Sequence, residues 1–361
     1  MTLLTRPLAR PLVLPAALLL AGGILTVILP ASSSEAGTPQ TLCGSTSSAS
    51  VSGGAYMVDN NEWGSSAYEC ITTNGNAEFR MLNSAIANGG DGAPGGYPDI
   101  YKGCNYGVCT SGSGLPIRVS NIHEGTVTTS WRTAQPGGSS IYNAAYDIWF
   151  NQTPATSGQA NGTELMVWLR RQGPKHPYGS QVASNVSIGG RSYNVWYGNA
   201  HGFNTVTYLM TTGKRSVTNL DLRPLEANAV GRGYLKKSWY LISVEAGFEV
   251  WQGGAGLATK SFSVKVTRHL ACDATVSQRY PADHSATDVV VKTADDARVT
   301  TVAHFSTGNR TRRLRATAQG RASTVYGVRN ARPGVRVPVS VAVRRGAGAG
   351  TCSTSFTPRA A

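Results

Sequence analysis

Charged residues are scarce in this sequence. They make up 14% of the 361 residues, whereas a typical soluble domain has about 25%. So low a charge content argues against a coiled coil, and 42 glycines and 17 prolines without a regular period argue against collagen. Hydrophobic residues reach 41%, which argues against wholesale disorder. The composition that remains is typical of a folded, loop-rich and largely β protein.

Metal-binding spacings are also lacking. The six cysteines include no Cys-x-x-Cys pair, and the six histidines are scattered through loop-like or basic contexts. We therefore expect no metal site and no cofactor. The order of the cysteines along the chain favours three disulfides, namely Cys43–Cys70, Cys104–Cys109 and Cys272–Cys352.

The N-terminal segment is typical of a secretory signal peptide. Arg6 and Arg10 precede an apolar run over residues 12–29, and small residues lead up to Ala36. An uncleaved membrane anchor is the alternative, because the run nears the ~18–20 residues that a membrane span needs. Proline and glycine interrupt the run, so we predict a signal peptide over residues 1–36. No later stretch is long enough to span a membrane, and we expect a soluble, secreted chain in a compartment where disulfides persist.

The positive charge is concentrated at the end of the chain. The formal net charge is +14, and residues 272–361 hold 13 arginines and one lysine against five aspartates. All seven tryptophans precede His269, so aromatic and basic residues occupy different regions. A nucleic-acid binder would interleave them, and we expect no nucleic-acid partner.

Strand-length patterns dominate the organisation. Between residues 56 and 266, short apolar runs with period-two alternation are separated by Gly, Asn, Ser and Pro turns. Residues 216–231 are predicted to form the one short helix. We predict an all-β fold with a concanavalin-like jelly-roll sandwich over residues 37–268. Residues 269–361 are predicted to form a small, basic, Ig-like β-sandwich closed by the Cys272–Cys352 bridge.

Three carboxylates lie inside apolar strand patterns. Glu164, Glu249 and Asp147 each share a strand face with a tryptophan. An ionised carboxylate in such a place is costly unless it is paired or faces a polar cleft. Paired carboxylates beside aromatic platforms suit sugar hydrolysis. The alternative is three half-buried acids that hydrogen bonds satisfy in a sandwich without any carbohydrate.

Five segments resemble glycoside hydrolase family 12, the small jelly-roll endoglucanases. The resemblance covers residues 56–262 in the expected order. It is carried by residues 60–64 (NNEWG), 101–104 (YKGC), 142–150 (YNAAYDIWF), 164–169 (ELMVWL) and 239–254 (WYLISVEAGFEVWQGG). Each motif alone is modest, and five in register are highly specific.

The resemblance implies a role for each matching residue. Glu164 corresponds to the nucleophile, Glu249 to the general acid/base, and Asp147 to a carboxylate that orients the nucleophile. The implied sugar contacts are Asn61, Trp63, Tyr106, Met166 and Trp168, and the first two disulfides match bridges of bacterial members. The chain departs from the family at Tyr106, where members often carry Trp, at Glu245, where Gln is common, and at Val250, where Pro is common. Along an extended strand Glu245 lies about 13 Å from Glu249, too far to be its partner; it would lower tolerance for acidic substrates.

The expected activity is that of a secreted, retaining endo-β-1,4-glucanase acting on cellulose or related β-glucans. A xyloglucan-specific hydrolase or a transglycosylase would use the same carboxylates, and a non-catalytic carbohydrate-binding jelly roll is a further alternative. We expect a monomer. The C-terminal region is a stabilising appendage, a cellulose-binding module, or a surface for anionic cell-wall polymer. The arginines that suggest the last reading are Arg310, Arg312, Arg313, Arg315, Arg344 and Arg345.

Overall fold

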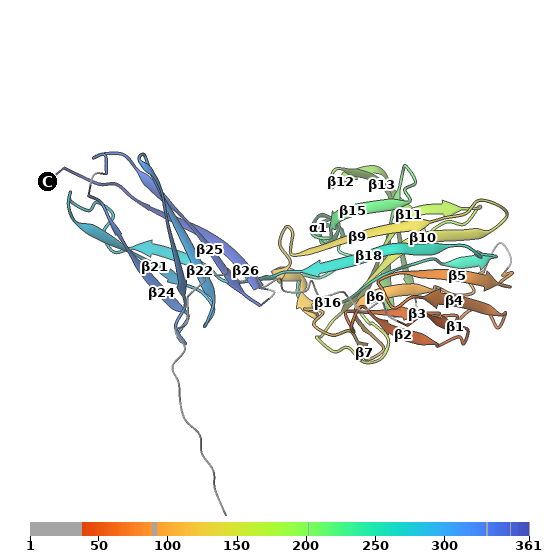
Figure 1. Ribbon diagram of the computed structural model, residues 1–361. Coiled ribbons are helices and arrows are strands. Elements are labelled where there is room, and N and C mark those ends of the chain that lie inside the picture. Colours follow the sequence, from red (N-terminus) through yellow and green to blue (C-terminus); the bar gives the residue numbers. More distant parts are fainter. Residues whose placement is uncertain (1–37, 89–91, 201, 330, 347, 361) are drawn as a thin grey trace, which may run out of the picture. The chain divides into compact units, whose positions relative to one another are not determined.

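Residues 40–266 form two β-sheets that share one apolar core (Figure 1). The computed structural model describes residues 38–88, 92–200, 202–329, 331–346 and 348–360. The predicted signal peptide, residues 1–36, therefore lies outside the described residues. No helix in the described part of the chain is long and apolar enough to cross a membrane.

The smaller of these two sheets has six strands. In spatial order they are β1 (Gln40–Leu42), β4 (Glu69–Thr73), β5 (Phe79–Ser84), β18 (Ala258–Val266), β9 (Val127–Ala134) and β15 (Ser216–Asp221). Strand β18 pairs with both β5 and β9, although more than 120 residues separate it from either strand along the chain. Such non-local pairing is typical of a jelly roll.

The larger sheet has twelve strands. Nine run in the order β12 (Ser180–Ile188), β13 (Arg191–Ala200), β14 (Phe203–Met210), β11 (Thr163–Gln172), β10 (Ile141–Asn151), β16 (Tyr240–Gly247), β6 (Asp99–Asn105), β3 (Tyr56–Asp59) and β2 (Ser48–Val51). Three short strands pair beside this path, namely β17 (Val250–Gln252) on β10, β7 (Val108–Cys109) on β6 and β8 (Ile117–Arg118) on β16. A 3₁₀ turn, Val119–Asn121, follows β8.

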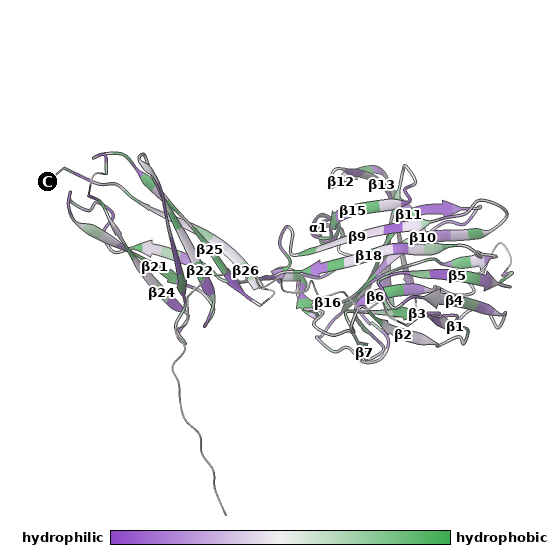
Figure 2. Cartoon of the chain, in the orientation of Figure 1, coloured by the Kyte–Doolittle hydropathy of each residue, from purple (hydrophilic) through white to green (hydrophobic). Residues whose placement is uncertain are grey.

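Period-two alternation positions the core. On β10, Tyr142, Ala144, Tyr146 and Ile148 enter the core between the two sheets, and the residues between them lie on the other face of the sheet. Figure 2 shows the same interleaving of hydrophobic and hydrophilic residues along many strands. The larger sheet thereby gains an outer face that is free to carry polar groups. The prediction of an all-β fold with one short helix is confirmed.

The predicted helix over residues 216–231 is wrong in its first half. Ser216–Asp221 is strand β15, paired with β9, and helix α1 spans Arg223–Gly231. The ladder shifts register between Val217 and Leu220, and Asn219 between them has φ 47°. This bulge turns both apolar side chains into the core with a spacing of three residues. The prediction rested on the spacing of Leu220, Leu225 and Val230, of which the first belongs to the strand and the other two to the helix.

Residues 268–356 form two further sheets with a core of their own. One sheet contains β19 (Arg268–His269), β26 (Gly348–Phe356), β25 (Val337–Arg345), β22 (Arg298–Phe305) and β23 (Gly308–Arg315), and the other contains β20 (Asp273–Val276), β21 (Ala286–Lys292) and β24 (Arg321–Gly327). All three predicted disulfide pairings are present, so this prediction is confirmed. The Ig-like assignment of these sheets stays a prediction.

Candidate active site

Strand β11 presents the first of three carboxyl groups on the outer face of the larger sheet. Its residues 165, 167 and 169 belong to the core, so Glu164 lies on the opposite face. The Glu164 side chain is partly exposed and accepts a 2.8 Å hydrogen bond from the hydroxyl of Thr205 on β14. Burial raises the pKa of Glu164 to about 7, and the hydrogen bond from Thr205 acts in the opposite direction because it favours the charged form.

Asp147 lies beside Glu164 on the neighbouring strand. In the β10–β11 ladder Glu164 is opposite Trp149, two residues from Asp147, so the two carboxyls are diagonal neighbours on one face. Diagonal positions are roughly 7–8 Å apart in the backbone, within reach of both side chains. Asp147 is only 6% exposed. Burial, followed by the nearby charges of Glu164 and Glu249, raises the pKa of Asp147 well above its usual range.

Asn143 holds the third carboxyl residue in place. The backbone N–H of Glu249 donates to Asn143 Oδ1 at 3.0 Å, and the Asn143 N–H donates to the Glu249 carbonyl at 3.0 Å. The Asn143 side-chain amide also donates to Glu249 Oε2. Burial and then the charge of Glu164 raise the pKa of Glu249 to about 8, whereas the Asn143 hydrogen bond lowers it.

Because their charges act on one another, Glu164, Glu249 and Asp147 form one carboxyl cluster. Glu164 and Glu249 keep partial exposure, whereas Asp147 is buried beneath them. Among the described residues, no lysine, arginine or histidine forms a salt bridge with any of the three. Such a cluster holds fewer charges than carboxyls at neutral pH. It can therefore offer a proton from one accessible carboxyl and a nucleophilic oxygen from the other.

The sequence profile of glycosyl hydrolase family 12 matches residues 54–267, which is more than half of the chain and contains all three carboxyls. The chain belongs to this family. The profile ends before the two C-terminal sheets.

Known proteins agree with this family membership. A probable cellulase, Cel12b, from Mycobacterium tuberculosis is 34% identical over 155 residues, which are 43% of this chain and 99% of that protein. The solved endoglucanase cel12A from Rhodothermus marinus is 41% identical with a TM-score of 0.60, covering 63% of this chain and 99% of its own. A family 12 xyloglucanase from Bacillus licheniformis is 28% identical with a TM-score of 0.56, covering 63% and 100%. The predicted jelly roll is thereby confirmed, and the chain is a glycoside hydrolase.

The residues predicted to contact sugar in this family 12 chain differ in solvent exposure. Trp63 is 57% exposed and Tyr106 is 64% exposed, so both present ring surface to solvent. The Tyr106 hydroxyl is hydrogen-bonded to Gln159. Asn61 donates through its side-chain amide to Asp99 Oδ2 at 3.0 Å, which links it to a buried carboxyl of β6.

Met166 and Trp168 form an apolar layer with Trp251 instead of an open platform. Trp168 is only 2% exposed, and its ring centroid lies 6.3 Å from that of Trp251. Ala145 on β10 completes this small cluster. The layer lies on the same sheet face as Glu164, and it stiffens the support beneath the carboxyls while offering little surface to a ligand.

Two residues that sequence reasoning left without a role position the carboxyls. Asn143 and Thr205 hold Glu249 and Glu164 respectively. Asn143 stands within a largely apolar strand, and a polar residue there is a signal that a partner exists. Thr205 gives no such signal, because threonine is common in strands.

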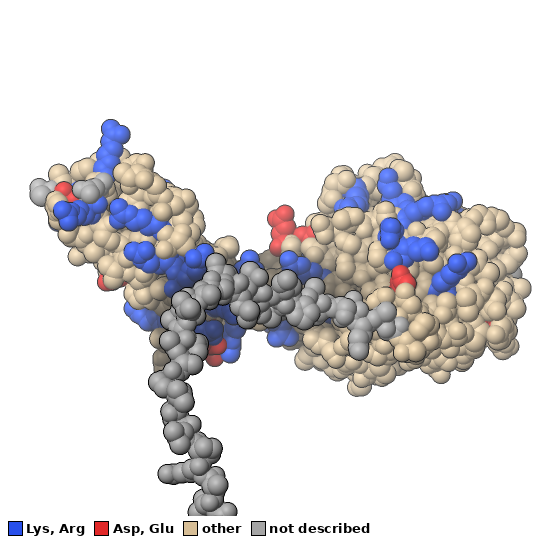
Figure 3. Space-filling model, in the orientation of Figure 1, with Lys and Arg blue, Asp and Glu red and all other residues tan. Residues whose placement is uncertain are grey.

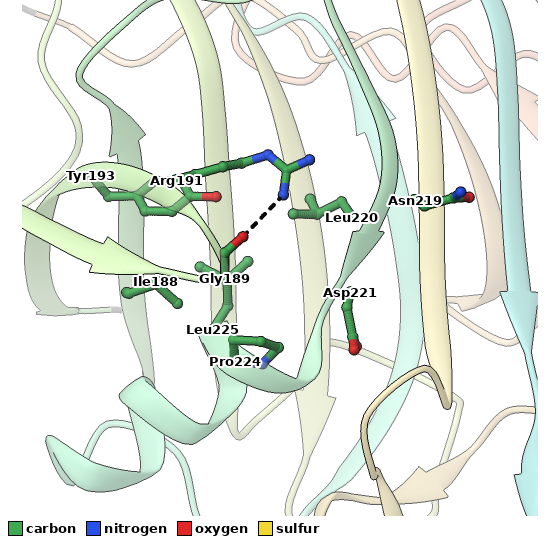
Figure 4. Close-up of a pocket in the computed structure, with 9 residues that line it drawn as sticks. All are labelled: Ile188, Gly189, Arg191, Tyr193, Asn219, Leu220, Asp221, Pro224 and Leu225. Atoms are coloured by element: carbon green, nitrogen blue, oxygen red, sulfur yellow. Dashed lines mark hydrogen bonds between the residues drawn. The ribbon is translucent and has the colours of Figure 1, made fainter.

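A separate cavity of about 90 Å³ contains none of the clustered carboxyls (Figure 4). It lies between the β12–β13 turn and the start of α1, and Arg191 donates there to the Gly189 carbonyl at 3.4 Å. No group of three or more His, Cys, Asp or Glu side chains suited to a metal ion occurs in the described part of the chain.

Proposed function

We propose that this chain is a retaining endo-β-1,4-glucanase with Glu164 as nucleophile and Glu249 as general acid/base. Family membership supports the reaction class. The observation that carries the residue assignment is that Glu164 and Glu249 are the accessible members of a carboxyl cluster whose charges act on each other. Retaining glycosidases need two such groups about 5–5.5 Å apart.

In the first step ionised Glu164 attacks the anomeric carbon and the glycosidic C–O bond breaks. Glu249 gives its proton to the departing oxygen, so the leaving sugar departs as a neutral alcohol. Asn143 occupies Glu249 Oε2 as a hydrogen-bond donor, which leaves Oε1 as the oxygen that carries the proton. The products of this step are a glycosyl ester on Glu164 and an ionised Glu249.

In the second step water resolves the ester. Glu249, now a base, takes a proton from the water, whose oxygen attacks the anomeric carbon and releases Glu164 as a carboxylate. The charge of Glu164 disappears in the ester and returns at the end. The charge of Glu164 raises the pKa of Glu249. The pKa of Glu249 is therefore lower while the ester exists, which keeps Glu249 ionised and able to accept the proton from water.

The remaining predicted residues would bind or support the chain of sugars. Exposed Trp63 and Tyr106 suit stacking on sugar rings. Asn61, fixed by Asp99, suits a hydroxyl contact. Buried Met166 and Trp168 would act only as a floor.

The substrate is proposed to be a β-1,4-glucan of the cellulose type, supported by the cellulase and endoglucanase names of two relatives. A xyloglucan-specific activity is the second candidate, since one structural neighbour is a xyloglucanase. Initial rates on soluble cellulose, mixed-linkage glucan and xyloglucan compare the two. A rate on xyloglucan well above the others would replace the first candidate by the second. Anomeric analysis of products and of added acceptors would separate hydrolysis from transglycosylation.

Substrates with different leaving groups test the two roles separately. With an activated aryl β-cellobioside the leaving group needs little help from a proton, so Glu249→Gln should still release the aryl group in a first burst. Glu164→Gln should release none. Both variants should lose most activity on polymer, by about 10³-fold or more. A burst from Glu164→Gln and none from Glu249→Gln would reverse the assignment, and near-normal polymer turnover by either would refute it.

Export is proposed alongside this activity, and it is supported by the pairing of all six cysteines in disulfides. Mass spectrometry of the protein from the culture medium of an expressing host tests both export and cleavage after Ala36. Retention of the whole chain inside the cell would contradict the proposal.

The C-terminal sheets are proposed to bind anionic cell-wall polymer through a row of arginines. Arg298 on β22 is opposite Arg315 on β23 and Arg344 on β25. Like charges placed directly opposite each other repel, so such a row favours an anion between them. These arginines line a cavity of about 340 Å³. Figure 3 shows more Lys and Arg than Asp and Glu on the visible face of this region.

Two of the arginines near this cavity are already paired. Arg315 contacts Asp296 at 2.7 Å and Arg345 contacts Asp295 at 2.6 Å. Within the described ranges no carboxylate forms a salt bridge with Arg298 or Arg344, so these two are the anchors for a ligand. The site would take a carboxylate or phosphate group of a polymer.

Retention on immobilised polygalacturonate and on immobilised polyphosphate tests this site. Full-length Arg298→Ser/Arg344→Ser should elute at clearly lower salt than wild type. Arg321→Ser/Arg329→Ser, with the same charge loss away from the cavity, should elute nearly as wild type does. If both double variants elute at equally reduced salt, the retention depends on net charge and not on this cavity. Salt-insensitive retention on crystalline cellulose would instead favour a cellulose-binding module, and no retention on any polymer a stabilising appendage.

A further inference from the structure

Glu245 lies directly opposite Asp147 in the ladder between β16 and β10. On β16, Val244 and Ala246 enter the core, so Glu245 shares the outer face with Asp147. Side chains that oppose each other in this way have Cβ atoms about 4.5–5.5 Å apart. Glu245 is 2% exposed, and its Oε1 has no hydrogen-bond partner in the described structure.

Glu245 is the central member of a row of carboxyls that crosses five neighbouring strands. Asp59 on β3 is opposite Asp99 on β6, and Asp99 is diagonal to Glu245, which is opposite Tyr101 of the same strand. Continuing across the sheet, the row carries one carboxyl on each strand, in the order Asp59, Asp99, Glu245, Asp147 and Glu164. The row ends at the proposed nucleophile.

In the described part of the chain, no basic side chain forms an ion pair with a carboxyl of this row. The titratable groups that face Glu245 are Asp147 from β10, Tyr101 and Asp99 from β6, Asp59 from β3 and Glu164 from β11. Ser243 and Trp149 favour its charged form, and Asn61 donates to Asp99. Glu249 acts on Asp147 as well, and the charge of Asp147 in turn raises the pKa of Tyr97. None of the described lysines or arginines forms a salt bridge with a member of the row.

Two buried carboxyls at this separation cannot both be ionised, so they share a proton. Asp147 is the diagonal neighbour of Glu164, and a charge on Asp147 would oppose the charge that Glu164 needs for attack. A charge on Glu245 is one strand further from Glu164. The lower-energy arrangement keeps the proton on Asp147 and the charge on Glu245.

We propose that Glu245 is a positioning residue that holds Asp147 in its neutral form, and that it thereby keeps Glu164 ionised and sets the pH range of the reaction. The proposal rests on the roles assigned above to Glu164 and Glu249. This arrangement also lowers the free energy of unfolding, since Glu245 and Asp147 stay buried with one negative charge between them.

The isosteric variant Glu245→Gln removes one charge from the row. Asp147 then loses the repulsion that keeps it protonated, so its pKa falls, and its charge lies one strand nearer to Glu164 than the charge of Glu245 did. The pKa of Glu164 therefore rises, and the acidic limb of the profile of kcat/KM against pH should move to higher pH, by about 1 pH unit. Glu245→Asp keeps the charge and should restore most of the wild-type profile, which a purely steric role of Glu245 would not produce.

Glu226→Gln is the matched control. Glu226 is a fully buried carboxyl on α1, and its charged neighbours are Arg223 and Asp221 instead of the row. This variant should leave the pH profile in place. An unshifted profile for Glu245→Gln, or an equal shift for Glu226→Gln, would overturn the proposal.

A titration without turnover separates this proposal from the proposed function. Carboxyl ¹³C NMR of side-chain-labelled wild type and Glu245→Gln follows Asp147 and Glu164 directly. If the titration midpoint of Asp147 falls and that of Glu164 rises in the variant while the wild type hydrolyses no β-glucan, the coupling holds and the proposed function fails. If the midpoints stay unchanged, the coupling fails whatever the activity is.

Discussion

Asn143 forms hydrogen bonds with both the backbone and the side chain of Glu249, although 106 residues separate the two in sequence. The contact fixes the segment between β16 and β17 against β10 and orients one oxygen of the carboxyl. A side chain with so few rotamers available is ready for proton transfer without further ordering. The pair therefore links the sheet register to the proposed acid/base chemistry.

Replacing Asn143 by alanine should loosen Glu249 and raise its pKa. The Asn143 hydrogen bond lowers that pKa, so its loss shifts the alkaline limb of kcat/KM to higher pH. We also expect kcat/KM to fall by about 10²-fold, since misplacement of a catalytic group by about 1 Å has that cost. Rates across pH 4–10 (roughly the range in which carboxyls of this kind titrate) measure both effects.

Asn151→Ala is the control for this variant. Asn151 lies at the other end of β10, is buried, and donates to the Ala155 carbonyl at 2.6 Å. It should cost stability of about 1 kcal/mol without moving the alkaline limb. An identical shift in both variants would show that loss of strand order, and not loss of the Glu249 contact, is the cause.

Thr205→Val tests the hydrogen bond that favours ionised Glu164. Valine matches threonine in shape but donates no hydrogen bond, so the pKa of Glu164 should rise from its value of about 7. Because attack requires ionised Glu164, the acidic limb of kcat/KM should move to higher pH, with a loss of roughly tenfold near neutral pH.

Thr207→Val is the matched control for Thr205→Val. Thr207 is buried on the same strand and face, and its Oγ1 has no hydrogen-bond partner among the described residues. This variant should leave the acidic limb unchanged. A limb that stays fixed in Thr205→Val would remove Thr205 from the set of positioning residues.

Local patterns in the sequence were enough to predict which face the site occupies. Alternation with period two placed Glu164 with Trp168 and Asp147 with Trp149, because side-chain direction within a strand depends only on neighbouring residues. The order of the cysteines similarly sufficed for the three pairings. The roles of these residues rested on the family resemblance.

The register between strands was beyond such reasoning. Glu245 was placed about 13 Å from Glu249 along its own strand, whereas its relevant neighbour, Asp147, is opposite it on another strand. The predicted helix likewise began too early, because the pairing of Ser216–Asp221 with β9 joins segments that are distant in sequence. Pairings between distant segments depend on the whole packed sheet, and single-strand periodicity carries no information about them.

Glu226 should make the stability of the protein fall as pH rises. Burial raises its folded-state pKa from 4.5 to about 8. The folded state therefore binds a proton that the unfolded state has released, and the stabilising effect of that proton is complete below about pH 4.5 and is lost as pH rises to about 8. Urea unfolding at pH 5 and pH 8 should show wild type losing on the order of 3 kcal/mol more than Glu226→Gln over this window. Equal losses would contradict the buried, protonated state of Glu226.

The Cys272–Cys352 bridge should contribute strongly to the stability of the C-terminal sheets. It closes a loop of 80 residues, and constraining a loop of that length in the unfolded chain stabilises the fold by about 4 kcal/mol. Calorimetry of full-length Cys272→Ala/Cys352→Ala should show one transition at clearly lower temperature, with the transition of the family 12 region retained. Cys104→Ala/Cys109→Ala, which opens a loop of only 5 residues, should instead perturb the region next to β6. If loss of Cys272–Cys352 leaves every transition in place, the bridge does not stabilise these sheets and their own core is sufficient.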